Sequence, residues 1–404
     1  MKRPRVVVTG LGVVSSIGIG WPAFLESLLA GRSGISEITS FDTSEFPTHR
    51  GGEVKDFRPE QYLAPEKLRR CNRASQFAIA STKMALQDAK LDLTKVPSGR
   101  VGVSVGTTMA EAQVIEAIDT DWVGNGETGI QSSLAPQYPA NVIGAHVAAE
   151  VGCTGPNLLI ATACAAGNYG IAYAFDLLQL GKVDVMIAGG ADAFSRIAFM
   201  GFNRLLAVAP DRCQPFDKNR KGMMVGEGAG ILVLETLDHA KARGAPIHAE
   251  VLGYGMSCDA SHMTIPDIDG VKRVMENALK NASLTPKDVS YINAHGTGTI
   301  ANDRNECAAI RAVFNGHADY LPVSSTKSMI GHTMGAASAL EAIACALSVR
   351  FGWVPPTINH ETPDPECDVD CIPNVARQRE VSIALNNSFA FGGNNACLVF
   401  KAHD

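Results

Sequence analysis

Short apolar runs alternate with longer amphipathic segments along the chain. Strands that are covered on both faces form near-continuous apolar runs, and four such runs predict buried strands: 101–105, 157–161, 183–188 and 230–234. Between them, the apolar positions of 73–88 fall on one helical stripe. Residues 167–180 do the same and stop before Gly181, a residue type that commonly follows helix ends. The alternation predicts an α/β protein with helices packed against buried sheets.

A glycine pattern occurs twice. A first strand at 5–9 is expected to turn at Gly10-Leu11-Gly12, and a strand at 249–253 runs into Gly253-Tyr254-Gly255. An internal duplication would produce this repeated pattern, and so could chance. A boundary near residue 245 would give an N-terminal half, 1–245, and a C-terminal half, 246–404.

Composition narrows the protein class. The 404 residues are 46% hydrophobic and 19% charged, which is typical of a globular protein. With 35 Lys and Arg against 41 Asp and Glu, the formal charge is −6, which argues against nucleic acid as a partner. No stretch of 18 apolar residues predicts a membrane span. Ten cysteines suit a reduced cytoplasmic enzyme better than a disulfide scaffold, and their spacing predicts no metal site.

A candidate nucleophile lies in Ala161-Thr162-Ala163-Cys164-Ala165-Ala166-Gly167. A strand ends here, small side chains follow, and a helix starts just after the cysteine. The positive end of a helix dipole favours a thiolate, so the pKa of Cys164 is expected to be lowered. Most cysteines are buried apolar residues, but this position makes Cys164 a candidate for covalent catalysis.

A second motif is His295-Gly296-Thr297-Gly298-Thr299, which follows a short strand that begins at Tyr291. A lone histidine is more often structural. Here the two glycines permit close approach of a ligand and the two hydroxyls can bind a polar chain. These features favour a functional role for His295, Thr297 and Thr299.

A third motif contains Lys327 and His332 in a loop of Ser and Thr residues, before a helix of small side chains at 335–346. Lysines are solvated by default, but Lys327 has no other charged residue within this loop.

The fourth motif is the turn 386–395, which joins two strands and carries Phe389, Phe391 and two glycines. A hairpin turn with core aromatics would explain it. Successive backbone N–H groups in such a turn can also form an oxyanion hole, with the phenylalanines gating an apolar channel.

In this order and at these spacings, the motifs resemble those of the β-ketoacyl-acyl carrier protein synthases, of the synthase I/II type within the thiolase superfamily. The agreement extends from Val6-Val7-Val8-Thr9-Gly10-Leu11-Gly12 to the final strand. The resemblance implies an α/β thiolase fold, with duplicated halves in a five-layered α/β/α/β/α arrangement. It also implies a cytoplasmic acyltransferase that works as a homodimer, or as a heterodimer with a chain-length factor.

The resemblance assigns roles to individual residues. Cys164 would accept the acyl group, and His295 and His332 would promote decarboxylation of malonyl-acyl carrier protein. Backbone N–H groups of Cys164 and Phe391 would form the oxyanion hole, with Phe391 also the gate. Lys327 would tune the site with Glu306 as its acidic partner. The substrate-binding residues would be Thr297, Thr299, Met109 and Phe389.

The implied reaction is decarboxylative Claisen condensation, which yields β-ketoacyl-acyl carrier protein in fatty-acid chain elongation. Phosphopantetheine would arrive on the acyl carrier protein, so no cofactor of the chain's own is expected. Docking of this acidic partner is expected at a basic cluster formed by Lys67, Arg69, Arg70 and Arg73. Solvation of a charged helix end would account for the same cluster.

Several alternatives stay open. Residues 106–111 are poorer in glycine than the matching turn of housekeeping relatives, and Ala390 and Asn394 replace Gly and Thr. A ketosynthase subunit of a type II polyketide or other secondary-metabolite pathway is therefore the alternative function. The spacing of Cys164 and His295 also suits a papain-like hydrolase, but the local cysteine signature is missing. A thiolase proper would need a second cysteine in 386–395, and a non-enzymatic subunit would not need Cys164.

Overall fold

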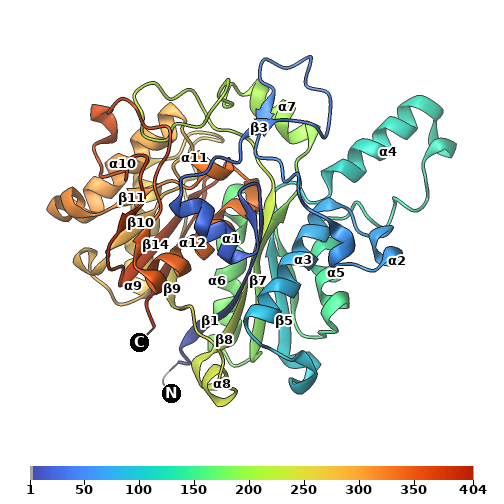
Figure 1. Ribbon diagram of the computed structural model, residues 1–404, viewed down its shortest axis with the longest axis horizontal. Helices are drawn as coiled ribbons and strands as arrows, with labels where there is room; N and C mark the ends of the chain where they lie inside the picture. Colours follow the sequence, from blue (N-terminus) through green and yellow to red (C-terminus); the bar gives the residue numbers. More distant parts are fainter. Residues whose placement is uncertain (1–2, 404) are drawn as a thin grey trace.

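A large mixed β-sheet organises the computed structural model, which describes residues 3–403 (Figure 1). Ten strands follow one another in the order β11-β10-β14-β15-β9-β1-β8-β7-β5-β6, and β2 pairs with β1. In chain order the strands are β1 (Val6–Ser15), β2 (Gly18–Ile19), β5 (Val101–Gly106), β6 (Asn157–Ile160), β7 (Val185–Asp192), β8 (Gly228–Thr236), β9 (Ala249–Cys258), β10 (Tyr291–Asn293), β11 (Val323–Ser324), β14 (Ile383–Phe389) and β15 (Asn394–Lys401). Two short pairs lie apart: β3 (Ser36–Glu37) with β4 (Arg50–Gly51), and β12 (Trp353–Val354) with β13 (Arg377–Gln378).

The strand order repeats on either side of the β1–β9 junction. One half of the sheet reads β6-β5-β7-β8-β1 and the other β11-β10-β14-β15-β9. In each half the three outer strands are parallel and the two inner ones are antiparallel to their neighbours. Only Val6, Val7 and Val8 of β1 pair with β9, so the halves are joined along a short stretch.

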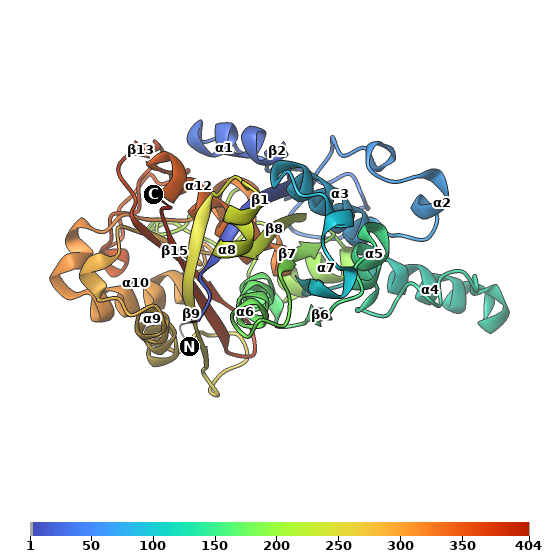
Figure 2. The ribbon, with the colours of Figure 1, turned by 90° about the horizontal axis from the view of Figure 1, so that it is seen from below.

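The helices complete five layers (Figures 1 and 2). Between the half-sheets lie α6 (Ala166–Gln179) and α12 (Ala337–Phe351), which contact each other and strands of both halves. Helices α3 (Arg73–Asp88) and α5 (Val142–Val151) cover the outside of one half, and α9 (Ile268–Asn281) and α10 (Ile300–Phe314) cover the outside of the other. The remaining helices are α1 (Trp21–Leu29), α2 (Pro65–Leu68), α4 (Ala112–Asn125), α7 (Arg196–Arg204), α8 (Leu237–Ala242) and α11 (Lys327–Ile330). This is the duplicated five-layered α/β arrangement that the resemblance implied.

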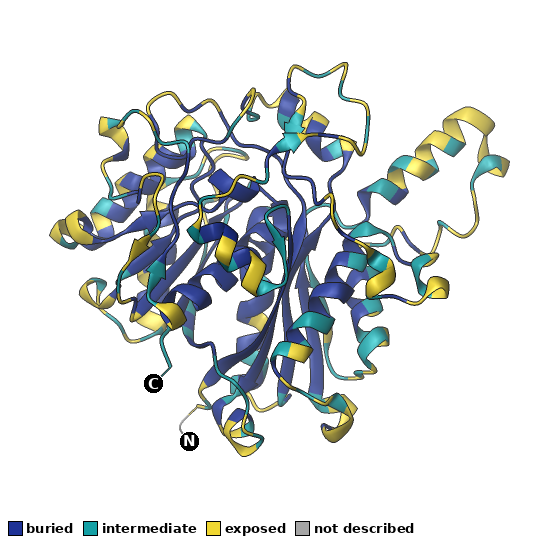
Figure 3. Ribbon diagram, in the orientation of Figure 1, coloured by how far each residue is buried: buried dark blue, intermediate teal, exposed yellow. Residues whose placement is uncertain are grey.

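The core lies in the strands and in the two central helices, where burial is greatest (Figure 3). Residues Met334–Phe351 form the one helix of the described part that is long and apolar enough to cross a membrane. Inside the protein, 89% of this stretch is buried. Its apolar character is therefore explained by its place in the central layer.

The expected turn at Gly10-Leu11-Gly12 is wrong, because β1 continues through it to Ser15. A Cβ on Gly10 would lie 2.1 Å from the Ala85 carbonyl oxygen of α3, and one on Gly12 would lie 1.8 Å from that of Ser81. On β9, a Cβ on Gly255 would lie 2.0 Å from a carbonyl oxygen of α9. These glycines let an outer helix approach the strand closely, and the repeated pattern marks equivalent strands of the two halves.

Candidate active site

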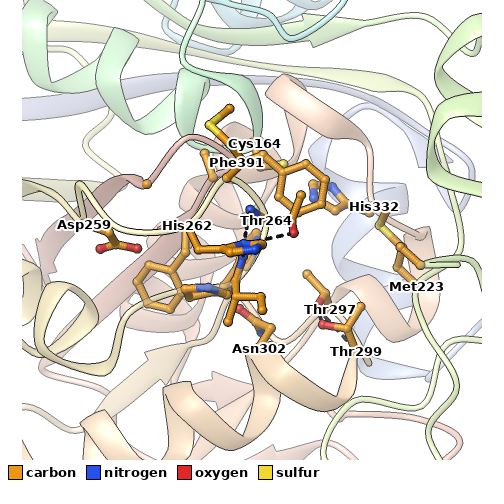
Figure 4. Close-up of a pocket in the computed structure, with 18 of the residues that line it drawn as sticks. Cys164, Met223, Asp259, His262, Thr264, Thr297, Thr299, Asn302, His332 and Phe391 are labelled. Carbon is orange, nitrogen blue, oxygen red and sulfur yellow. Dashed lines mark hydrogen bonds between the residues drawn. The ribbon is translucent and has the colours of Figure 1, made fainter. Parts of the chain in front are cut away.

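One cavity brings together the candidate residues of both halves (Figure 4). Figure 4 shows Cys164 and Phe391 on one side and Thr297 and Thr299 on the other. The cavity is lined by Cys164, Phe202, Ala207, Met223, Asp259, His262, Met263, Thr264, Ile265, Pro266, His295, Thr297, Thr299, Asn302, His332, Phe389, Ala390, Phe391 and Gly393. The thiol and the two imidazoles thus face one space.

Cys164 lies in a tight turn between β6 and α6. Ala163 has a φ of 48°, which is unusual for a residue with a side chain, and a 3₁₀ turn over Ala163–Ala165 leads directly into the helix. The side chain is only 5% exposed. The backbone N–H groups of Cys164 and Phe391 both favour the thiolate, so both lie near the sulfur. The two N–H groups expected to form an oxyanion hole therefore converge beside the reactive atom.

The expected lowering of the Cys164 pKa is wrong. Burial raises the pKa of this thiol to about 12, because a thiolate would lose its hydration there. Lys327 and the two backbone N–H groups lower it only in part. The resting group at neutral pH is a thiol, so its proton must leave when the sulfur attacks.

The two histidines lie edge to face, with ring centroids 5.5 Å apart. Burial and the charge of Lys327 hold the pKa of both His295 and His332 well below the usual value, so both rings are neutral at pH 7. The Met334 N–H donates to Nδ1 of His332 over 3.1 Å, which places the proton of that ring on Nε2. His332 can therefore donate a hydrogen bond through Nε2.

Lys327 is paired with Glu341 and not, as expected, with Glu306. Its Nζ lies 2.5 Å from Glu341 Oε1, and neither side chain is exposed. Lys327 begins α11, and Glu341 lies in the second turn of α12. Burial raises the pKa of Glu341 to about 7, although the ammonium beside it acts in the opposite direction.

Glu306 holds the backbone of the His295 loop. Its carboxylate accepts hydrogen bonds of 2.9 Å from the N–H groups of His295 and Gly296. Burial raises the pKa of Glu306 to about 7, opposed by these hydrogen bonds. Glu306 therefore acts on the site through His295, as a positioning residue.

Most of the predicted substrate-binding residues line the cavity. The hydroxyls of Thr297 and Thr299 lie 2.9 Å apart, and the Phe389 ring centroid is 5.5 Å from that of His295. Met109 is not among the lining residues, contrary to expectation. Its backbone N–H instead donates to the buried carboxylate of Asp192.

The basic cluster is only partly free to dock a partner. Arg73 pairs with the buried Glu227, with Nη2 2.5 Å from Oε1, so it is less free to dock a partner than the exposed arginines of the cluster. Lys67 pairs with Glu150 at 2.5 Å and remains partly exposed. Arg69 and Arg70 are exposed at the end of α2.

Sequence reasoning missed a loop that borders the cavity from 259 to 266. The Asp259 N–H donates to the Gly393 carbonyl, and the Gly392 N–H donates to that of Met263. Asn395 Nδ2 also donates to Asp259 Oδ1 over 2.6 Å. The loop is thus fastened to the Phe391 turn. In the sequence, the polar residues that follow the strand at 249–258 were the one indication of this loop.

Glu341 was also missed, although it is the single acidic residue in the small-residue helix that begins at Gly335. A charge in such a helix is buried only when a partner neutralises it.

Comparison with known proteins agrees with this geometry. The family "Beta-ketoacyl synthase, N-terminal domain" matches residues 3–240, and "Beta-ketoacyl synthase, C-terminal domain" matches 248–361. The chain is 42% identical over 412 residues to 3-oxoacyl-[acyl-carrier-protein] synthase 2 of Synechocystis sp., covering 100% of this chain and 99% of that protein. The enzyme of the same name from Staphylococcus aureus strain COL is 42% identical over 408 residues, with 99% of each chain covered.

Solved structures with the same fold include "The ishigamide ketosynthase/chain length factor", with a TM-score of 0.97 and 45% identity over 100% of both chains. A type II polyketide ketosynthase in complex with its acyl carrier protein has a TM-score of 0.92 and 35% identity, again over 100% of both chains. Both matches extend over the thiolase-type halves and the cavity between them. The chain belongs to the beta-ketoacyl synthase family of condensing acyltransferases.

Proposed function

We propose that this chain condenses an acyl group held on Cys164 with malonyl-acyl carrier protein, in fatty-acid chain elongation. The observation that carries the proposal is the single cavity in which a thiol, two neutral imidazoles and two converging backbone N–H groups meet. Each of these groups takes part in one of the two steps of the reaction, acyl transfer to Cys164 and condensation with the malonyl group.

In the first step, Cys164 Sγ attacks the carbonyl carbon of an acyl thioester, and the thiol proton passes to a neighbouring imidazole. The negative oxygen of the tetrahedral intermediate accepts hydrogen bonds from the Cys164 and Phe391 N–H groups, which lie near the sulfur. The carbon–sulfur bond to the pantetheine breaks, and its thiolate takes the proton. The acyl group is left on Cys164.

In the second step, the malonyl thioester oxygen accepts hydrogen bonds from His332 and His295. The bond to the malonyl carboxylate breaks, carbon dioxide leaves, and the electron pair forms an enolate that these donors stabilise. The enolate carbon attacks the acyl carbonyl on Cys164. The carbon–sulfur bond then breaks, which releases the β-ketoacyl product and returns the sulfur to its thiol form after protonation.

The long polar arm that carries these thioesters fits the side of the cavity that holds Thr297 and Thr299. We assign these hydroxyls to the phosphopantetheine of the carrier protein, which is part of the substrate. Phe391 would act as the gate to the acyl-binding space. The chemistry needs no cofactor of the chain's own.

The wider assignments follow from the same function. We propose acyl carrier protein as the partner that docks near Arg69 and Arg70, pairing of two thiolase-fold chains, and a cytoplasmic location. The two family matches, which end at 240 and begin at 248, support a division into halves near residue 245.

A second candidate is the ketosynthase subunit of a type II polyketide pathway. It is favoured by the 45% identity to the ishigamide ketosynthase/chain length factor chain, which exceeds the 42% identity to the synthases named above. Both candidates use the same chemistry at Cys164, and they differ in the acyl group accepted.

Intact-mass spectrometry after incubation with a panel of acyl carrier proteins tests both candidates. The wild type should gain one acyl group, mapped to Cys164, and the preferred acyl chain separates the two pathways. Cys164→Ala should gain none, whereas Cys153→Ala, a control outside the cavity, should behave as the wild type. Acylation that persists in Cys164→Ala would refute the proposal.

A further inference from the structure

Asp192 is a buried carboxylate near the active site that the proposed reaction does not use. It is the last residue of β7 and has no exposed surface. It takes part in none of the ion pairs that the described residues form. A buried charge without a counter-ion is costly, so hydrogen bonds must supply the compensation.

Four donors from two segments surround this carboxylate. Oδ1 accepts from the Thr107 hydroxyl over 2.7 Å and from the Met109 N–H over 2.9 Å. Oδ2 accepts from the Thr108 N–H over 2.8 Å and from the Gly335 N–H over 2.6 Å. Burial raises the pKa of Asp192 to about 6 and the hydrogen bonds oppose the rise, so the group is mostly ionised at pH 7. One charged group therefore ties the turn after β5 to the turn before α12.

The bond from Gly335 reaches the turn that fixes the His332 ring. Met334, the residue before this glycine, has a φ of 55°, and its N–H donates to His332 Nδ1 over 3.1 Å. A residue with a side chain is strained at positive φ and persists there only where its surroundings hold it. The turn is held closely, because a Cβ on Gly335 would lie 2.7 Å from Asp192 Oδ2, and a Cβ on Gly190 of β7 would lie 2.4 Å from the Gly335 carbonyl oxygen.

The backbone of His332 is held by other contacts. Its N–H donates to the Met224 carbonyl over 2.6 Å, and its own carbonyl accepts from the Gly226 N–H over 3.0 Å. These two bonds fix the position of the residue and leave the tautomer of its ring to the Met334 N–H. A disturbance of the 333–336 turn should therefore change the tautomer of His332 and keep the residue at the cavity.

The same carboxylate also acts on the nucleophile. Burial raises the pKa of Cys164 most, Lys327 lowers it, and the negative charge of Asp192 raises it further. Removing this charge should make the thiol more acidic and therefore more reactive. A purely structural role for the carboxylate does not produce such a gain.

We propose that Asp192 is a positioning residue for the condensation reaction. Its carboxylate holds the turn at Met334 and Gly335, so that His332 keeps its proton on Nε2 and donates from there to the malonyl thioester oxygen. The inference rests on the proposed function, because it assigns a cause to the orientation of one of the two imidazoles. The other donors to the carboxylate, at 107–109, anchor it to the opposite turn.

Asp192→Asn is the direct test, because it removes the charge and replaces one acceptor oxygen with an amide donor. Release of carbon dioxide from malonyl-acyl carrier protein should slow in kcat by about 10²-fold, whereas KM should change little because Thr297 and Thr299 are untouched. Alkylation of Cys164 by iodoacetamide at pH 8, followed by peptide mass mapping, should become at least about threefold faster. Nitrogen NMR of histidine-labelled protein should show the Nδ1–H tautomer of His332 in the variant and the Nε2–H tautomer in the wild type.

Glu53→Gln is a matched control. Glu53 is also a buried carboxylate, and it accepts hydrogen bonds from Thr39 and Ser40 in a loop that does not line the cavity. This change should lower the Tm and leave decarboxylation, alkylation and the His332 tautomer as in the wild type. Thr107→Val is a milder second variant, which keeps the carboxylate and removes one of its four donors. It should slow decarboxylation about two- to tenfold.

Decarboxylation at the wild-type rate in Asp192→Asn, or an unchanged tautomer of His332, would overturn the proposal. A decrease of both decarboxylation and alkylation, with a lower Tm, would also overturn it, because that result indicates a purely structural carboxylate. If Asp192→Asn does not fold, an unchanged decarboxylation rate in Thr107→Val decides against the proposal. If the wild type itself releases no carbon dioxide, the proposed function fails, and the His332 tautomer still reports whether Asp192 holds the turn.

Discussion

The buried ion pair of Lys327 and Glu341 offers the sharpest test of how the active site is supported. Both side chains have no exposed surface, and the charged atoms lie 2.5 Å apart. Removing one partner of a buried pair costs about 3–5 kcal/mol, because the remaining charge is left without compensation. We expect this full loss for Glu341→Gln, which leaves the Lys327 ammonium buried without a counter-ion.

Removing the lysine instead of the glutamate should cost less stability at low pH. In Lys327→Met the remaining group is Glu341, whose pKa burial already raises to about 7. Without the lysine this pKa rises further, so at pH 6 the side chain stays a neutral acid. A raised acid pKa favours the folded state below that pKa and loses this contribution as the pH rises through it. Lys327→Met should therefore be less destabilised at pH 6 than at pH 8.

Thermal unfolding gives the scale of the effect. An unfolding entropy of about 2.1 cal/mol/K per residue means that each kcal/mol lowers the Tm of a 404-residue chain by about 1.2 °C. Glu341→Gln should then lose about 4–6 °C. The double variant Lys327→Met/Glu341→Gln has no buried charge and should recover most of this loss. If its loss equals the sum of the two single losses, the pair is not coupled and the reasoning fails.

Three further predictions concern catalysis, docking and stability. His295→Ala or His332→Ala should slow malonyl decarboxylation about 10²–10³-fold and should slow Cys164 acylation, followed by mass, by less, because the remaining imidazole can still take the thiol proton. Arg69→Glu/Arg70→Glu should raise the KM for malonyl-acyl carrier protein and not for malonyl-coenzyme A; an unchanged KM would refute docking there. Burial raises the pKa of Glu111 to about 7, so wild-type stability should fall between pH 5 and 8 by about 3 kcal/mol more than in Glu111→Gln, measured by urea unfolding. Equal pH dependence in both proteins would contradict this.

The sequence predicted regular elements well where a local pattern determines them. The helix expected at 73–88 is α3 with the same ends, because its apolar stripe reports directly which face is buried. The prediction of a turn at Gly10-Leu11-Gly12 was wrong because glycine is found in two situations. It occurs in turns, and it also occurs where another segment packs closely against a strand. Here the approaching segment is α3, about 70 residues away, and a local pattern carries no information about that contact.

In the candidate site, too, the sequence predicted the features that local motifs determine and missed those that depend on tertiary packing. Cys164, His295 and His332 were identified from their motifs, and the structure places them around one cavity. The pKa of Cys164 was misjudged because the helix start is visible in the sequence, whereas the burial that outweighs it depends on tertiary packing. Glu306 was preferred to Glu341 because nothing in the sequence tells which acidic residue reaches Lys327 once the helices pack.

The site depends on equivalent turns in the two halves. Ala163 and Met334 both have positive φ, of 48° and 55°, and each begins a 3₁₀ turn that leads into a central helix. The two helices meet at these ends, where the Asn168 N–H donates to Ser338 Oγ over 3.0 Å. One turn carries the Cys164 thiol, and the other follows directly after His332. The two turns share a conformation and a sequence pattern, Thr-x-x-Ala-Ala at 162–166 and 333–337. The fold places these two local structures end to end, and so brings the nucleophile and the imidazole to the same place.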